Sequence, residues 1–309
     1  MLILIVATLG GALACRGREP ECRSLLGEPL YAPALSDEIR SQREEQLAAA
    51  RDRLEQDPED VDAMIWVGRR TAYLGHYREA ISVYDGAIER YPEDPRPYRH
   101  RGHRYITLRR FDQAIDDLER AARLIADTQD EIEPDGLPNA RNLPRSTLHS
   151  NIWYHLGLAY YLRGNFEQAL RCYRECLKVS KNPDMLCATS HWLYMTLRRL
   201  SRDREAASLL EPIRESMDII ENRAYHELLL MYKGERTADE LLARALDDED
   251  ALNLASAGYG VGNWHLLGGE SGQAEDVFRR IVDGGQWPAF GHIAAEAELA
   301  RSSSEQIQQ

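Results

Sequence analysis

The chain has 309 residues, with 38 Lys and Arg against 51 Asp and Glu, and its formal net charge is −13. This acidic balance argues against a general nucleic-acid-binding protein, because such proteins need a basic surface. The composition, 43% hydrophobic and 8% aromatic, is that of an ordinary folded protein. The length suits one extended array of elements or two compact domains.

The first fourteen residues, Met1 to Ala14, carry no charge and are almost wholly apolar. They are too few to span a bilayer, which takes about 20 helical residues. They suit the apolar region of a secretory signal, and Ala12 and Ala14 are small residues of the kind that a signal peptidase requires. The segment Ala12-Leu13-Ala14-Cys15 resembles the lipobox of bacterial lipoproteins, although no Lys or Arg precedes the apolar run.

This resemblance implies that residues 1–15 are a lipoprotein-type signal peptide with Cys15 as the lipidation site. The protein would then be exported and lipid-anchored in the bacterial cell envelope, facing the periplasm. The alternative is a plain signal peptide cut near Ala14. Residues 16–35 contain several Gly and Pro residues, and this composition predicts a flexible tether.

Two stretches, Val61 to Pro92 and Pro95 to Ala126, share a pattern of small and aromatic residues at a period of 34. The matching residues are Gly68, Gly75, Tyr77, Ala80, Tyr84, Ala87 and Pro92 in the first stretch, and Tyr98, Gly102, Tyr105, Phe111, Ala114, Leu118 and Ala121 in the second. A glycine at the eighth place lets the two helices of a hairpin touch. An alanine at the twentieth place makes room on the other side.

This 34-residue pattern resembles the tetratricopeptide (TPR) repeat family. The resemblance implies an all-α fold, a superhelical solenoid of antiparallel helix hairpins. A single hairpin cannot bury its apolar face, so copies must stack on one another.

The repeats organise most of the chain, and we expect the solenoid to span residues 36–301. Clear copies occupy 61–94, 95–128 and 150–183, degenerate copies occupy 187–250, and a further copy at 255–288 precedes a capping helix at 289–301. Residues 302–309 are polar and predict a disordered tail. Between the second and third copies the period is exceeded by 21 residues, and three prolines there predict a loop over 129–147.

The sequence gives no case for catalysis, a cofactor or a metal site. It has no nucleophile elbow, Gly-rich phosphate loop or HExxH, and His100 and His103 have no nearby Cys or acid at ligand spacing. We therefore expect a protein that is not an enzyme. Four cysteines, Cys22, Cys172, Cys176 and Cys187, could form disulfides in an exported protein, but core packing is favoured for the middle two, which lie four apart on one helix.

By resemblance to the family, the helix face opposite the hairpin contact would line a concave groove. This face is basic at one end and aromatic in its middle. The candidate binding residues are Arg69, Tyr73, Arg96, Arg99, His103, Asn151, Tyr154, Tyr161 and Arg198. Arginine can bind a carboxylate through two parallel hydrogen bonds, and tyrosine supplies contact area at low entropy cost. We therefore expect the partner to be a protein or extended peptide with acidic groups or a free C-terminal carboxylate.

The alternative is that these arginines pair with acids on neighbouring helices and only keep the surface soluble. Arg101 stands where the family has a large apolar residue. This departure implies either a half-buried ion pair or a slightly turned helix.

The sequence therefore predicts an envelope-anchored, non-catalytic scaffold that binds its partner in the concave groove. One alternative is an enzyme, or a glycan or small-molecule binder, that uses the 129–147 insertion as a lid. Paired carboxylates in the groove would favour that alternative, and the repeat frame places only Asp62 there. A second alternative is a spacer that binds a periplasmic partner through its convex side.

Overall fold

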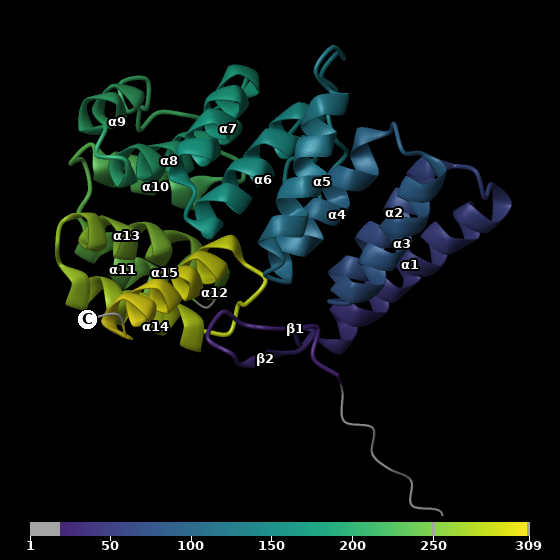
Figure 1. The fold of residues 1–309 in the computed structure, drawn as a ribbon, viewed down its shortest axis with the longest axis horizontal. Helices are drawn as coiled ribbons and strands as arrows, with labels where there is room; N and C mark the ends of the chain where they lie inside the picture. Colours follow the sequence, from purple (N-terminus) through teal and green to yellow (C-terminus); the bar gives the residue numbers. More distant parts are fainter. Residues whose placement is uncertain (1–18, 249–250, 308–309) are drawn as a thin grey trace, which may run out of the picture.

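The computed structural model describes residues 19–248 and 251–307. The predicted signal segment and Cys15 lie outside these residues. The regular secondary structure of the described chain is almost entirely helical, as Figure 1 shows, and this confirms the predicted all-α solenoid fold class. The exception is a two-stranded antiparallel pair, β1 (Cys22–Arg23) and β2 (Pro29–Leu30).

Antiparallel hairpins follow a first helix, α1 (Asp37–Gln56), and in this N-terminal half each helix packs on the next one along the chain. The hairpins are α2 (Val61–Tyr73) with α3 (Tyr77–Arg90), α4 (Pro95–Thr107) with α5 (Phe111–Leu124), and α6 (Leu148–Arg163) with α7 (Phe166–Val179). These hairpins coincide with the three clear repeats.

The predicted glycine contacts hold these hairpins together. A Cβ at Gly102 would lie 2.7 Å from the Leu118 Cγ, and one at Gly68 would overlap the Tyr84 ring. Because no side chain fits at either glycine, the two helices of each hairpin approach closely at this place. Ala80 and Ala114, at the twentieth place, are completely buried.

Side-chain caps explain where the helices of the repeats begin. Asp60 accepts hydrogen bonds from two backbone amides at the start of α2, and Asp94 does so from one at the start of α4. Thr147 and Ser150 form a capping box that begins α6 directly after the insertion. Each cap satisfies amides that have no partner within their own helix.

The C-terminal half continues the array with elements of more varied length. They are α8 (Pro183–Arg199), α9 (Asp203–Leu209), α10 (Arg223–Tyr232), α11 (Ala238–Asp247), α12 (Ala251–Asn253), a π-helical turn η1 (Leu254–Gly258), α13 (Tyr259–Leu267), α14 (Ser271–Asp283) and α15 (Phe290–Ile307). The last helix passes the predicted end of the cap at residue 301. The expectation of a disordered tail is therefore wrong as far as Ile307.

The N-terminal segment is bound to the C-terminal end of the solenoid. Leu25 N donates to Glu296 Oε2 at 3.1 Å, and Trp287 Nε1 donates to the Tyr31 carbonyl at 2.8 Å. Cys22, Leu25 and Leu30 also pack against the main core. The prediction of a flexible tether is therefore wrong for residues 19–35, because this segment has apolar side chains to bury. Figure 1 shows β1 and β2, in purple, beside the yellow C-terminal helices.

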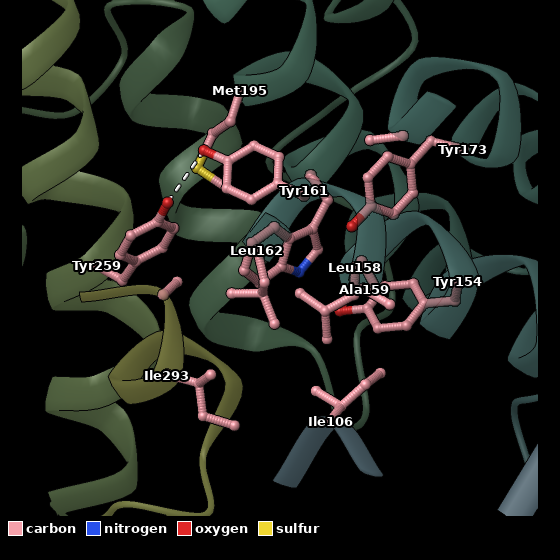
Figure 2. Packing of buried hydrophobic residues seen from close by; sticks show 14 of the residues in the cluster. Ile106, Tyr154, Leu158, Ala159, Tyr161, Leu162, Tyr173, Met195, Tyr259 and Ile293 are labelled. Carbon is pink, nitrogen blue, oxygen red and sulfur yellow. Dashed lines mark hydrogen bonds between the residues drawn. The ribbon is translucent and has the colours of Figure 1, made fainter. Parts of the chain in front are cut away.

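One hydrophobic core runs from the repeats into the C-terminal half. Tyr161 stands edge-on to Trp192 with ring centroids 5.3 Å apart, and the Tyr259 hydroxyl donates to that of Tyr161 at 3.0 Å, which Figure 2 shows as a dashed line. Cys172 and Cys176 are buried, and this confirms their predicted role in core packing. The four cysteines of the described chain are all free thiols.

Candidate protein-binding site

The 129–147 insertion is a loop, as predicted, and part of it lies against the predicted groove. The Glu133 carboxylate pairs with the Arg99 guanidinium at 2.9 Å, and it accepts a hydrogen bond from Asn151 Nδ2 at 3.1 Å. The Arg99 and Glu133 side chains are only 9% and 10% exposed. A carboxylate of the chain itself therefore occupies the basic end of this face.

The backbone that follows Glu133 binds two more arginines. Arg69 Nη2 donates to the Pro134 carbonyl at 2.9 Å, and Arg70 Nη1 donates to the Gly136 carbonyl at 2.9 Å. Gly136 is buried, and a Cβ there would overlap the Tyr73 hydroxyl and lie 2.8 Å from Arg69 Nη2. Only glycine allows the loop to approach so closely.

We call the surface that holds this stretch the insertion-binding surface. Its residues are Arg69, Arg70, Tyr73, Arg99 and Asn151. Four of these five were predicted from the sequence as binding residues. The sequence did not predict Arg70, because the repeat frame assigns it to no groove position. The Arg70 guanidinium carbon lies 4.9 Å from the centre of the Trp66 ring, but a tryptophan at this position does not by itself indicate a binding site.

A cavity of about 100 Å³ remains beneath the insertion, and it carries more positive than negative charge. It is lined by Arg69, Ala72, Tyr73, Tyr84, Arg99, His100, His103, Arg104 and Glu133. Burial, reinforced by the neighbouring arginines, holds the pKa of His100 well below its usual range, and the same causes lower the pKa of His103. The two imidazoles are therefore neutral, and the cavity charge comes from three arginines and one glutamate.

The middle of the predicted groove is filled by the C-terminal half. Tyr154 and Tyr161 are 7% and 0% exposed, and the ring of Phe290, from α15, lies 5.2 Å from that of His103. The prediction that these three residues face an open groove is wrong, because α13 and α15 fold back against α6. Figure 2 shows Tyr154 and Tyr161 among the core residues.

Two outer candidates pair with acids instead of lining an open surface. Arg96 forms ion pairs with Asp94 and Asp62, each at 2.5 Å, and Arg198 pairs with Asp203 at 2.8 Å. Arg96 and Arg198 therefore agree with the alternative interpretation, in which the arginines pair with nearby acids and do not bind a partner.

The unusual Arg101 is explained in the same way. Its guanidinium binds the Asp117 carboxylate through two hydrogen bonds, at 2.8 and 2.7 Å, and reaches Asp85 at 2.7 Å. The predicted half-buried ion pair is therefore confirmed, since the Arg101 side chain is 17% exposed.

A wider hollow of about 1050 Å³ lies between α5, α6 and α7, and sequence reasoning gave no sign of it. Trp153 and Tyr160 of α6 contribute aromatic surface, and the Tyr160 hydroxyl donates to Glu119 at 2.5 Å. Arg123 and Lys178 at its edge pair with Glu119 and Glu175.

Residues 19–248 and 251–307 contain no group of three or more His, Cys, Asp or Glu side chains placed to hold a metal ion. Over the same described ranges, every helix is too short or too polar to cross a membrane.

Comparison with known families agrees with this geometry. Two family models described as "Tetratricopeptide repeat" match residues 68–130 and 150–183, which cover the same hairpins as the clear repeats. Over these residues the chain matches the tetratricopeptide repeat family. Proteins of this family are generally non-catalytic interaction scaffolds that bind other proteins or peptides.

Among curated proteins, this TPR protein is similar to the BBSome complex member BBS4 of Bos taurus. The two are 27% identical over 140 residues, which is 45% of this chain and 23% of the relative. The chain thus matches less than a quarter of that relative's length.

Solved structures of similar fold include a tetratricopeptide repeat protein from Parabacteroides merdae, BtubC from P. vanneervenii and YrrB, described as a TPR protein with an unusual peptide-binding site. Their sequence identities are 14%, 16% and 16%, with TM-scores of 0.48, 0.45 and 0.44. They cover 85%, 88% and 82% of this chain, over 98%, 93% and 98% of their own lengths.

Proposed function

We propose that this TPR protein is an envelope-anchored, non-catalytic scaffold that binds an acidic segment of a partner protein on its insertion-binding surface. The anchor would be a lipid on Cys15. The ion pair between Arg99 and Glu133 is the observation that supports this proposal most strongly. In this ion pair the surface already binds an extended acidic stretch of polypeptide, namely the chain's own insertion.

The energetics of Arg99 support the same proposal. Its guanidinium is buried and lies among other arginines, and burial lowers its pKa. Removing one partner of a buried ion pair costs about 3–5 kcal/mol, because an uncompensated charge is left behind. Arg99 therefore requires a carboxylate in any stable state of the protein, and a partner can displace Glu133 only by supplying another one.

The enzyme alternative loses support from the same contacts. A carboxylate that acts as an acid or a base must be able to reach a substrate. Asp62 is held by Arg96, and Glu133 is held by Arg99 and Asn151. These contacts make both groups structural.

A photo-crosslinking amino acid at Tyr73 tests the proposal in cells. Tyr73 lies on the insertion-binding surface, whereas Tyr98 of α4 lies by Arg101, away from that surface, and serves as the matched control. We expect a specific protein adduct from position 73 that is absent from position 98 and lost when Arg99→Met is added. Equal adducts at both positions, or adducts unchanged by Arg99→Met, would contradict the proposal.

A further inference from the structure

The insertion is held by polar groups, and its large apolar side chains face solvent. Ile132, Leu137 and Leu143 are 67%, 57% and 49% exposed. Gly136, which has no side chain, is the buried residue at the centre of the contact. Since burial of apolar surface is the main source of local stability, this segment is held much less firmly than the helices beneath it.

Near its C-terminal end the insertion is fixed to the C-terminal half, because Arg145 pairs with the fully buried Asp184 at 3.1 Å. The attachments around residues 139–141 are at the surface. Arg141 pairs with Asp218 at 2.7 Å, and both side chains are more than half exposed. Exposed pairs of this kind contribute about 0–1 kcal/mol. Residues 133–141 can therefore leave their surface without disrupting the core while Arg145 stays paired with Asp184, provided that another carboxylate takes the place of Glu133.

We infer that residues 133–136 are an intramolecular stand-in for the partner, and that the partner segment carries the same chemistry. This inference rests on the proposed function and adds the identity of the recognised segment. The partner supplies a carboxylate to Arg99, the carbonyl of the next residue to Arg69, and a carbonyl two residues further on to Arg70.

The contacts also define which residues the segment can carry. Proline fits the second position, because only the carbonyl of Pro134 is bonded to Arg69. The fourth position requires glycine, because a Cβ at Gly136 would overlap the Tyr73 hydroxyl. The preferred partner is therefore an extended acidic segment of the form Glu-Pro-x-Gly. In the chain's own copy x is Asp135, which has one buried carboxylate oxygen.

The chain's own copy of this segment competes with the partner. A tethered segment acts at an effective concentration in the millimolar range for a short flexible connection. The apparent affinity for a partner falls in proportion to the fraction of molecules whose surface is free. Removing the internal segment without altering the surface should therefore raise the affinity for an external copy.

The test uses the full chain and a fluorescein-labelled peptide with the sequence of residues 131–137, which reads EIEPDGL. Gly136→Val prevents the chain's own segment from docking and leaves every arginine in place. Ala140→Val, at an exposed position of the same insertion, is the matched control. By fluorescence anisotropy we expect Gly136→Val to bind the peptide at least about tenfold more tightly than the wild type and Ala140→Val to match the wild type.

A peptide with glutamine at the position of Glu133 should bind Gly136→Val at least about tenfold more weakly. Equal peptide affinity of the wild type and a folded Gly136→Val chain would overturn the inference, and so would equal affinity for the two peptides. If Gly136→Val does not fold, the peptide affinity of Glu133→Gln is compared with that of the wild type instead. The peptide should then also raise the melting temperature of the Glu133→Gln chain. A protein adduct at position 73 in cells together with no gain in Gly136→Val would overturn this inference and leave the proposed function standing.

Discussion

Arg109 and Glu296 form an ion pair at 2.6 Å between residues 187 positions apart, and their side chains are 3% and 0% exposed. Arg109 follows α4, and Glu296 lies on the last helix, α15. Arg109 also donates to the Trp287 carbonyl, while Leu25 of the N-terminal segment donates to Glu296. These contacts join the N-terminal segment of the described residues and α15 to the first repeats, and α15 thereby covers the middle of the concave face.

The first prediction concerns this ion pair. Glu296→Gln leaves Arg109 buried without a carboxylate, so the free energy of unfolding should fall by about 3–5 kcal/mol in urea titrations. Glu275→Gln is the matched control, since its partner Arg279 is exposed, and it should change stability by less than about 0.5 kcal/mol. Equal effects of the two variants would show that the pair does not hold the ends together.

The second prediction tests the repeat frame through two glycines of one hairpin. Gly68→Leu should lower the free energy of unfolding by about 1–3 kcal/mol, because its side chain meets the Tyr84 ring. Gly86→Ala in α3 should raise it by up to about 1 kcal/mol, because no atom lies within 4 Å and alanine favours the helix. Thermal or urea unfolding measures both, and destabilisation by Gly86→Ala would contradict the packing described.

The third prediction concerns acid pH. Burial lowers the pKa of His191 to about 3, and burial together with nearby arginines lowers those of His100, His103 and His155. Below an unfolded pKa of about 6.5, the unfolded chain binds protons that the folded chain does not, so stability falls as the pH falls. Each such histidine contributes up to about 1.4 kcal/mol per pH unit.

The urea midpoint should therefore be clearly lower at pH 5.5 than at pH 7.5. His191→Gln should make this difference smaller, because it removes one buried neutral imidazole. A midpoint that does not vary between the two pH values would contradict the burial of neutral histidines.

The fourth prediction concerns the anchor. Cys15→Ser should abolish labelling by a fatty-acid probe and release the protein from the membrane fraction, because the resemblance to a lipobox assigns the lipid to this residue. Fractionation with and without the substitution measures the effect. Unchanged membrane association would place the attachment elsewhere.

The sequence was sufficient for features that depend on local spacing. The hairpin contacts of Gly68 and Gly102 and the loop between the second and third repeats follow from the 34-residue period. The charged Arg101 at an apolar place indicated a half-buried ion pair or a slightly turned helix, and the structure shows the ion pair. Four of the five residues of the insertion-binding surface were also predicted, because they share one face of their helices.

The remaining features depend on contacts between distant parts of the chain. Tyr161 was expected to face a partner, but Tyr259, 98 residues further on, covers it. Arg109 holds α15 in place through Glu296, and nothing in the repeat pattern indicates this contact. A repeat pattern describes how each hairpin packs on its neighbour, and it contains no information on where the array folds back on itself.

Hydrogen–deuterium exchange of the full chain, with and without a saturating peptide of sequence EIEPDGL, tests most directly whether the insertion occupies a binding surface. Two amide hydrogens should exchange slowly while the loop is docked, because both are hydrogen-bonded within it. Glu133 N donates to the Ser146 carbonyl, and Leu148 N donates to the Glu131 carbonyl. The account predicts that the peptide increases exchange of Glu133, while the amides of α4 exchange as before or more slowly. Unchanged exchange throughout residues 129–147 at saturating peptide would contradict it, because the peptide would then be bound elsewhere.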